Sequence, residues 1–96
     1  MKARLLQKSR EEFAGGVIVE TVLWELPEAS PERPHRLKYR LYCGREGNCI
    51  VRYDNETGKG DHRHYATHEE PYLFISFAKL IDDFLADVER LAGVRL

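Results

Sequence analysis

The feature that most constrains the fold is an amphipathic segment near the C-terminal end of the chain. Its apolar residues recur at steps of three and four and form one continuous stripe of Phe77, Leu80, Ile81, Phe84, Leu85, Val88 and Leu91. Ser76 is placed to be the N-cap of this helix, and Gly93 to end it. Such a stripe must be buried against a second layer, and the preceding segments have the character of strands. We therefore expect an α+β fold in which a curved antiparallel sheet of about four strands packs against one long C-terminal helix.

Four upstream segments have the pattern of strands. Residues 17–26 are rich in β-branched and aromatic side chains and carry apolar residues on both faces. In residues 37–43 apolar and polar side chains alternate, so that this strand has one apolar face and one basic face. Residues 49–54 return after a glycine-containing turn. Residues 2–13 are compatible with either a strand or a helical turn, and we favour a strand.

The register of the hairpin made by the third and fourth strands follows if Cys43 pairs with Cys49. This pairing sets Arg40 opposite Arg52 on the basic face. Like charges directly opposite each other destabilise a sheet. An anion or an acid between the two guanidinium groups, or a bulge in one strand, would relieve the repulsion.

Length and composition set further limits. The 96 residues predict a single domain over residues 1–96, because the three prolines between residues 27 and 34 predict only a short surface loop. A net charge of −1 argues against wholesale adhesion to nucleic acid or to an anionic membrane. Residues 34–64 nevertheless hold seven Lys and Arg against four Asp and Glu. The sequence has no signal or membrane-spanning pattern, so we expect a cytoplasmic protein without a membrane partner, whose cysteines stay reduced.

The most polar part of the chain is residues 52–64, which hold three acids, three cations, two histidines and two glycines. Because such a stretch cannot form core, we expect a loop that runs from Asp54 to His64. Its glycines and lysine lack the spacing of a phosphate-binding loop, and its side-chain oxygens do not follow the pattern of an EF-hand calcium-binding loop. Ionisable side chains on a glycine-containing turn are instead typical of acid–base or phosphate chemistry.

These side chains predict metal-independent cleavage of an RNA phosphodiester, with no cofactor. The reaction needs a base for the ribose 2′-OH, an acid for the leaving oxygen, and cations for the charge on the phosphorane. The predicted catalytic residues are Asp54, Lys59, Asp61, His62 and His64. Basic side chains on the outer sheet face and next to the histidines would bind the RNA strand, with a tyrosine to stack on a base. The predicted substrate-binding residues are Lys38, Arg40, Arg52, Arg63 and Tyr72.

Other interpretations of the same residues stay open. His62 and His64, with Asp61 beside them and His68 nearby, can bind a transition metal, which would make the protein a metal-dependent nuclease or transferase. On a strand the two histidines would share one face, whereas in a loop they need not. The basic face can also belong to a non-catalytic module that grips a nucleic acid or an acidic partner. Finally, polar loops are commonly solvated surface without chemistry.

Several motifs of the chain resemble the TumE-like toxins of prokaryotic toxin–antitoxin systems. They are Trp24-Glu25-Leu26-Pro27, Lys38-Tyr39-Arg40, residues 52–64, Glu70-Pro71-Tyr72-x-Phe74 and Asp83-Phe84-x-x-Asp87-Val88, and together they extend over most of the chain. The resemblance implies a small growth-inhibiting toxin that is held by a cognate, DNA-binding antitoxin encoded beside it. By analogy with other small toxins it makes RNA the expected target. A homodimer is also compatible with this assignment.

Overall fold

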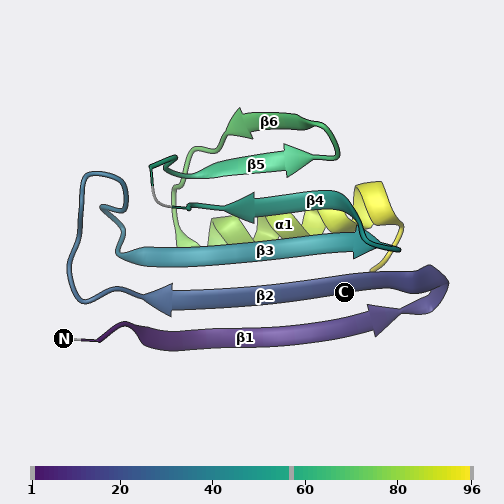
Figure 1. The fold of residues 1–96 in the computed structure, drawn as a ribbon, viewed down its shortest axis with the longest axis horizontal. Coiled ribbons are helices and arrows are strands. Elements are labelled where there is room, and N and C mark those ends of the chain that lie inside the picture. The colour runs from purple at the N-terminus through teal and green to yellow at the C-terminus, as the bar shows by residue number, and fades with distance from the viewer. Residues whose placement is uncertain (1, 57, 96) are drawn as a thin grey trace.

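A computed structural model of the chain describes residues 2–56 and 58–95; Thr57, which falls within the predicted polar loop, lies outside them. Six strands form one sheet in which each strand pairs antiparallel with its neighbours in sequence, and one helix follows them (Figure 1). The predicted α+β class is confirmed, with six strands in place of about four. The elements are β1 (Arg4–Phe13), β2 (Val17–Glu25), β3 (Leu37–Arg45), β4 (Asn48–Asp54), β5 (His62–Tyr65), β6 (His68–Pro71) and α1 (Phe77–Ala92).

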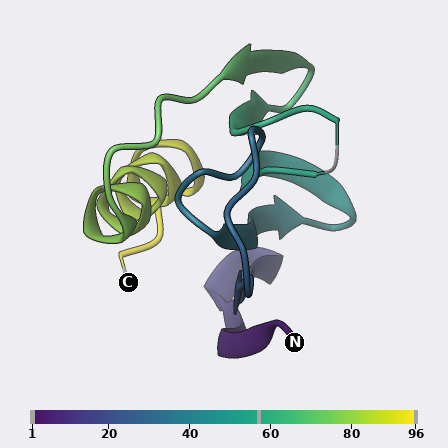
Figure 2. The ribbon, with the colours of Figure 1, turned by 90° about the vertical axis from the view of Figure 1, so that its left-hand side faces the viewer.

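The C-terminal helix begins and ends where its sequence predicts. The Ser76 side chain accepts a hydrogen bond from the backbone N–H of Lys79, and Gly93 ends the helix in the left-handed region at φ 70°. Within the apolar stripe Leu80, Phe84 and Val88 are fully buried and Ile81 and Leu85 partly so, whereas its two ends, Phe77 and Leu91, stay 41% and 38% exposed. Figure 2 shows α1 on one side of the sheet only.

The core lies between α1 and one face of β2, β3 and β4. Its buried side chains are contributed by alternate strand residues, such as Leu41 and Tyr53, and by the helix, where the Phe84 ring meets the Tyr53 ring at a centroid distance of 5.8 Å. Because successive side chains of a strand point to opposite faces, the intervening residues point away from α1. We call this opposite side the outer face; it carries Lys38, Arg40, Tyr42, Arg52, Asp54, His62, His64 and Glu69.

The predicted register of the β3–β4 hairpin is wrong. Cys43 pairs with Val51, and a bulge follows between Cys43 and Gly44. The shift sets Arg40 opposite Asp54, so that residues of opposite charge occupy facing positions where the sequence predicts two arginines. The bulge therefore brings an acid to the centre of the outer face.

The predicted loop is shorter than expected, because residues 62–65 form strand β5 and residues 68–71 form strand β6. A tight turn at residues 66–67 joins the two strands, with Ala66 in the left-handed region at φ 52°. His62 and His64 therefore lie on a strand and share one face of it. Within residues 2–56 and 58–95, no helix has the length and apolar character that crossing a bilayer requires.

Candidate active site on the outer face

Two rows of polar side chains run across the outer face because β4, β5 and β6 pair in register. One row places Asp54 of β4 opposite His62 of β5, and the other places Arg52 opposite His64 and His64 opposite Glu69 of β6. Side chains directly opposite each other in a sheet lie close enough to interact. The register therefore concentrates two imidazoles, two carboxylates and one guanidinium group in one place.

Asp54 and His62 form the buried floor of this cluster. Their side chains are only 3% and 5% exposed, and Oδ1 of Asp54 lies 2.6 Å from Nε2 of His62. The other carboxylate oxygen of Asp54 lies 2.8 Å from Nε of Arg52. On the far side of the ring, Nδ1 of His62 lies 3.0 Å from the backbone oxygen of Gly60. A carbonyl oxygen can only accept, so Nδ1 carries the ring hydrogen and Nε2 faces the carboxylates.

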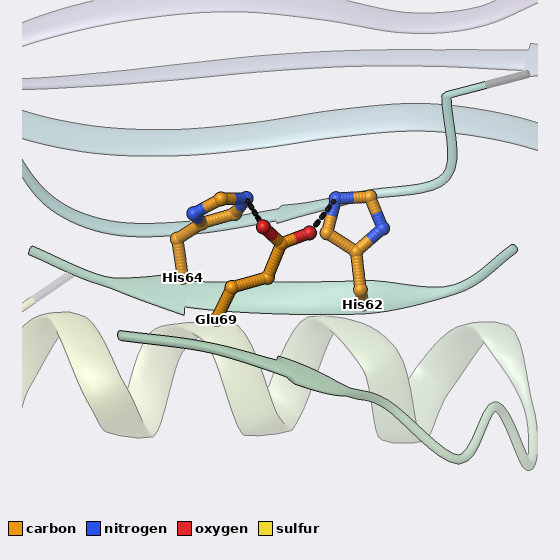
Figure 3. Close-up of side chains that lie close together, drawn as sticks. All are labelled: His62, His64 and Glu69. Atoms are coloured by element: carbon orange, nitrogen blue, oxygen red, sulfur yellow. Dashed lines mark ion pairs between the residues drawn. The ribbon is translucent and has the colours of Figure 1, made fainter. Parts of the chain in front are cut away.

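The carboxylate of Glu69 lies between the two histidine rings. Its Oε1 lies 3.4 Å from Nε2 of His62, and its Oε2 lies 3.5 Å from Nε2 of His64 (Figure 3). The two rings stand edge to face with their centroids 5.3 Å apart. These nitrogen and oxygen atoms lie within 4.8 Å of one another, which makes the three residues a candidate holder for a metal ion.

The electrostatic surroundings favour the neutral form of one of these imidazoles. Burial is the main cause that lowers the pKa of His64, and the nearby Arg52 guanidinium lowers it further, while Glu69 opposes the shift. A neutral imidazole can accept a proton or bind a metal through its bare nitrogen. The His64 ring is 18% exposed and is reached from solvent more readily than the ring of His62.

Cations border the cluster on both sides. Lys59 places its ammonium nitrogen 3.7 Å from Oε1 of Glu69, at a hollow of about 330 Å³ that Lys59, Asp61, His62, Glu69, Glu70 and Pro71 line. On the β3 side, Lys38 and Arg40 are exposed and line a second hollow of about 170 Å³ together with Trp24. Among the described residues neither of these two cations has an ion-pair partner within 4.0 Å.

Three of the predicted site residues point elsewhere. Asp61 accepts hydrogen bonds from the Tyr39 hydroxyl at 2.5 Å and from His35 at 3.0 Å. Arg63 lies on the helix side of β5, where it donates to Glu70 and to the Tyr53 hydroxyl. Tyr72 is buried and donates to Asp83 of α1 at 2.6 Å. The structure thus brings together Lys38, Arg40, Arg52, Asp54, Lys59, His62 and His64, and it separates Arg63 and Tyr72 from them. Asp61 lines the same hollow as Lys59 and His62, but its carboxylate is held by Tyr39 and His35.

The comparison with family models decides where the chain belongs. The model described as toxin TumE matches residues 2–92, which is nearly the whole chain. The chain belongs to the TumE toxin family. No significant match was found among curated proteins or among solved structures. Membership in a family of toxins indicates an antitoxin as partner, and it confirms the resemblance carried by the sequence motifs.

In this TumE-family chain, Glu69 is a site residue that the sequence does not predict. A hairpin with its turn at residues 66–67 would set His64 opposite Glu69, as observed. Ala66 and Thr67 carry no glycine or asparagine signal for such a turn, so the hairpin is not evident from the sequence.

Proposed function

We propose that this TumE-family toxin is an endoribonuclease that acts in the cytoplasm and binds RNA across its outer face. The observation that carries the proposal is the gathering of both histidines with Lys38, Arg40 and Arg52 on the sheet face opposite α1. A toxin that carries proton-transfer groups beside unpaired cations is equipped for phosphodiester chemistry. RNA supplies its own nucleophile for that reaction, the 2′-hydroxyl.

The proposed reaction needs no outside reactant for the first cut. The 2′-oxygen bonds to the adjacent phosphorus while the bond from phosphorus to the 5′-oxygen breaks, a base takes the 2′-proton, and an acid protonates the leaving 5′-oxygen. The His62–His64 pair would supply these proton transfers. Arg52 and Lys59 stand beside it as cations for the charge on the phosphorane.

The RNA strand would approach from the β3 side. Lys38 and Arg40 are suited to hold phosphates, and the guanidinium of Arg40 lies 5.0 Å from the centre of the Tyr42 ring, which supports its orientation. Trp24 lines the same hollow as these cations and offers an aromatic face for a base. Because Tyr72 is buried, Trp24 replaces it as the proposed stacking residue.

Cleavage of a labelled RNA by the purified chain tests the proposal. The His64→Ala variant should lose about 100-fold or more in rate, the usual contribution of a general acid or base, while circular dichroism confirms that it folds. His68→Ala is the matched control, because that side chain is 67% exposed and lies at the end of β6 outside the cluster. Undiminished cleavage and growth inhibition by the His64→Ala protein would overturn the proposal.

A non-catalytic RNA-binding module is the second candidate, favoured by the exposed charges of Lys38 and Arg40, which have no ion-pair partner among the described residues. In that case the double variant Lys38→Glu, Arg40→Glu should abolish binding and His64→Ala should have no effect. Two lost phosphate contacts on a single strand would change the slope of log K against log salt by about 1.4. Toxicity that depends on the two cations but not on His64 would decide for this candidate.

A further inference from the structure

We infer that His62, His64 and Glu69 form a binding site for a divalent transition-metal ion of the zinc class. The site consists of two imidazole nitrogens from alternate residues of β5 and one carboxylate from the facing residue of β6. Whether the ion binds does not depend on the proposed function. A role of the ion in cleaving RNA does rest on that function.

The spacing of the donor atoms is the first support. The distances from Glu69 to the two Nε2 atoms, 3.4 and 3.5 Å, exceed the 2.7–2.9 Å or so of a charge-assisted hydrogen bond. Two ligands at about 2.0–2.2 Å from a tetrahedral Zn²⁺ are separated by about 3.3–3.6 Å. The distance from the Glu69 carboxylate to each imidazole nitrogen is therefore that between two ligands of one metal ion.

An unsatisfied polar atom at the same place is the second, independent support. Among the described residues, Nε2 of His64 is out of reach of solvent and has no hydrogen-bond partner. Buried polar groups without partners are rare and commonly mark a bound water or ion. This nitrogen faces the Glu69 carboxylate at 3.5 Å.

The neighbours of the site orient its ligands. The Nδ1–H of His62 donates to the Gly60 carbonyl at 3.0 Å, which holds the ring with its other nitrogen toward the cluster. Such contacts of the non-ligating nitrogen are usual for metal-bound histidine. Asp54 lies beside the same ring with a carboxylate that Arg52 holds through the opposite oxygen.

The ligand set selects the class of metal. Imidazole nitrogens suit Zn²⁺, Co²⁺, Ni²⁺ and Cu²⁺, whereas Mg²⁺ and Ca²⁺ prefer sites built from oxygen. Three protein ligands leave a fourth position, as in catalytic zinc sites. Glu69 is 42% exposed and lines the larger hollow, so this position would face solvent beside Lys59. When bound, the ion would supply an activated water or polarise a phosphoryl oxygen.

Isothermal titration of the EDTA-dialysed full chain with ZnCl₂, and absorption spectra with CoCl₂, test the inference. We expect one ion per chain, an intense tetrahedral Co²⁺ spectrum, and no heat from MgCl₂ at the same concentrations. Glu69→Gln and His64→Gln should each weaken binding by about tenfold or more, since even second-shell changes at metal sites cost that much. The matched controls Glu70→Gln and Cys49→Ser should bind like the unmodified chain.

Two outcomes would overturn the inference. They are the absence of stoichiometric Zn²⁺ binding, and binding that Cys49→Ser abolishes while Glu69→Gln leaves it intact. RNA cleavage in EDTA separates the two proposals. If the chain cuts RNA but binds no Zn²⁺, the proposed function stands and the metal site is refuted. If the chain binds Zn²⁺ but cuts no RNA, the metal site stands and the proposed function is refuted.

Discussion

Replacing Asp61 by Asn distinguishes a positioning role from the catalytic role that the sequence predicts. The Asp61 carboxylate accepts from the Tyr39 hydroxyl at 2.5 Å and from Nε2 of His35 at 3.0 and 3.1 Å, and it is 13% exposed. Burial, followed by the hydrogen bond to Asp61, raises the pKa of Tyr39, so that the phenol keeps its proton and donates it. Asp61 thus fastens the segment before β5 to the core.

The cost of the substitution follows from these contacts. Hydrogen bonds to a charged group contribute about 1.5–3 kcal/mol each, and the amide of Asn keeps one acceptor oxygen while turning a donor toward Tyr39 or His35. Losing about one such bond gives an expected destabilisation of about 2–3 kcal/mol. In a domain of this size each kcal/mol lowers Tm by about 4–8 °C, so we expect a fall of about 10–20 °C.

Thermal unfolding followed by circular dichroism measures this effect, and Asp82→Asn on the exposed side of α1 is the control, with an expected change within about 2 °C. Below its Tm, the Asp61→Asn protein should cut RNA at a rate within a fewfold of the unmodified chain. An unchanged Tm together with lost cleavage would refute the reasoning and establish Asp61 as a catalytic residue.

Three further changes give expected outcomes. Ser76→Ala removes the N-cap of α1 and should cost about 1 kcal/mol in urea unfolding. Gly44→Ala would place a Cβ atom 2.1 Å from the Tyr42 hydroxyl oxygen and 2.8 Å from the backbone oxygen of Asn48. The Tyr42 side chain must then move and the bulge must distort, so a loss of about 1–3 kcal/mol is expected by the same measurement. Burial alone raises the pKa of Asp83, but its hydrogen bonds, chiefly from Lys79, leave that pKa lowered. The pKa of Asp83 is therefore lower in the folded chain than in the unfolded chain. Its ionised carboxylate stabilises the fold at a pH above the unfolded-state pKa, and this contribution is lost as the pH falls through the folded-state pKa. The difference in free energy of unfolding between the unmodified chain and Asp83→Asn should therefore become smaller in acid.

Local sequence patterns predict the helix and strands β2, β3 and β4, whereas for β1 they favour a strand without excluding a helical turn. The apolar stripe needs no knowledge of the partner strands, and the caps at Ser76 and Gly93 act within a single turn. The alternation in β3 likewise appears because one of its faces is buried and the other is not. Each of these signals is contained in a short stretch of chain.

Strands β5 and β6 escape prediction because most of their inward positions are not apolar. Arg63 and Glu70 face each other on the helix side of the hairpin and form an ion pair with an N–O distance of 3.0 Å. A charged residue on both faces of a strand removes the period-two pattern that marks a half-buried strand. The wrong assignment of Arg63 to the RNA-facing side of the site follows from the same cause: in a loop its direction is unconstrained, whereas in β5 it alternates with the histidines.

The site itself could be predicted as a set of residue types and only partly as a geometry. The density of ionisable residues between Asp54 and His64 identifies the region. The contact between Asp54 and His62 depends on strand pairing, and the position of Arg40 depends on a bulge that the sequence offers only as one of several ways to relieve the repulsion between Arg40 and Arg52. Register between strands is a property of the whole sheet, so it is the feature that is hardest to predict from local sequence.

The order of the strands also divides the molecule into parts that open at different free energies. β1 is joined to the sheet through β2 alone and is exposed at eight of its ten positions, so its opening uncovers little buried surface. β4 is paired on both sides and covered by α1. Backbone amides of β1 should therefore exchange with solvent deuterium long before those of β4. The cluster around His62 and His64 can stay assembled while the opposite edge of the sheet opens and closes.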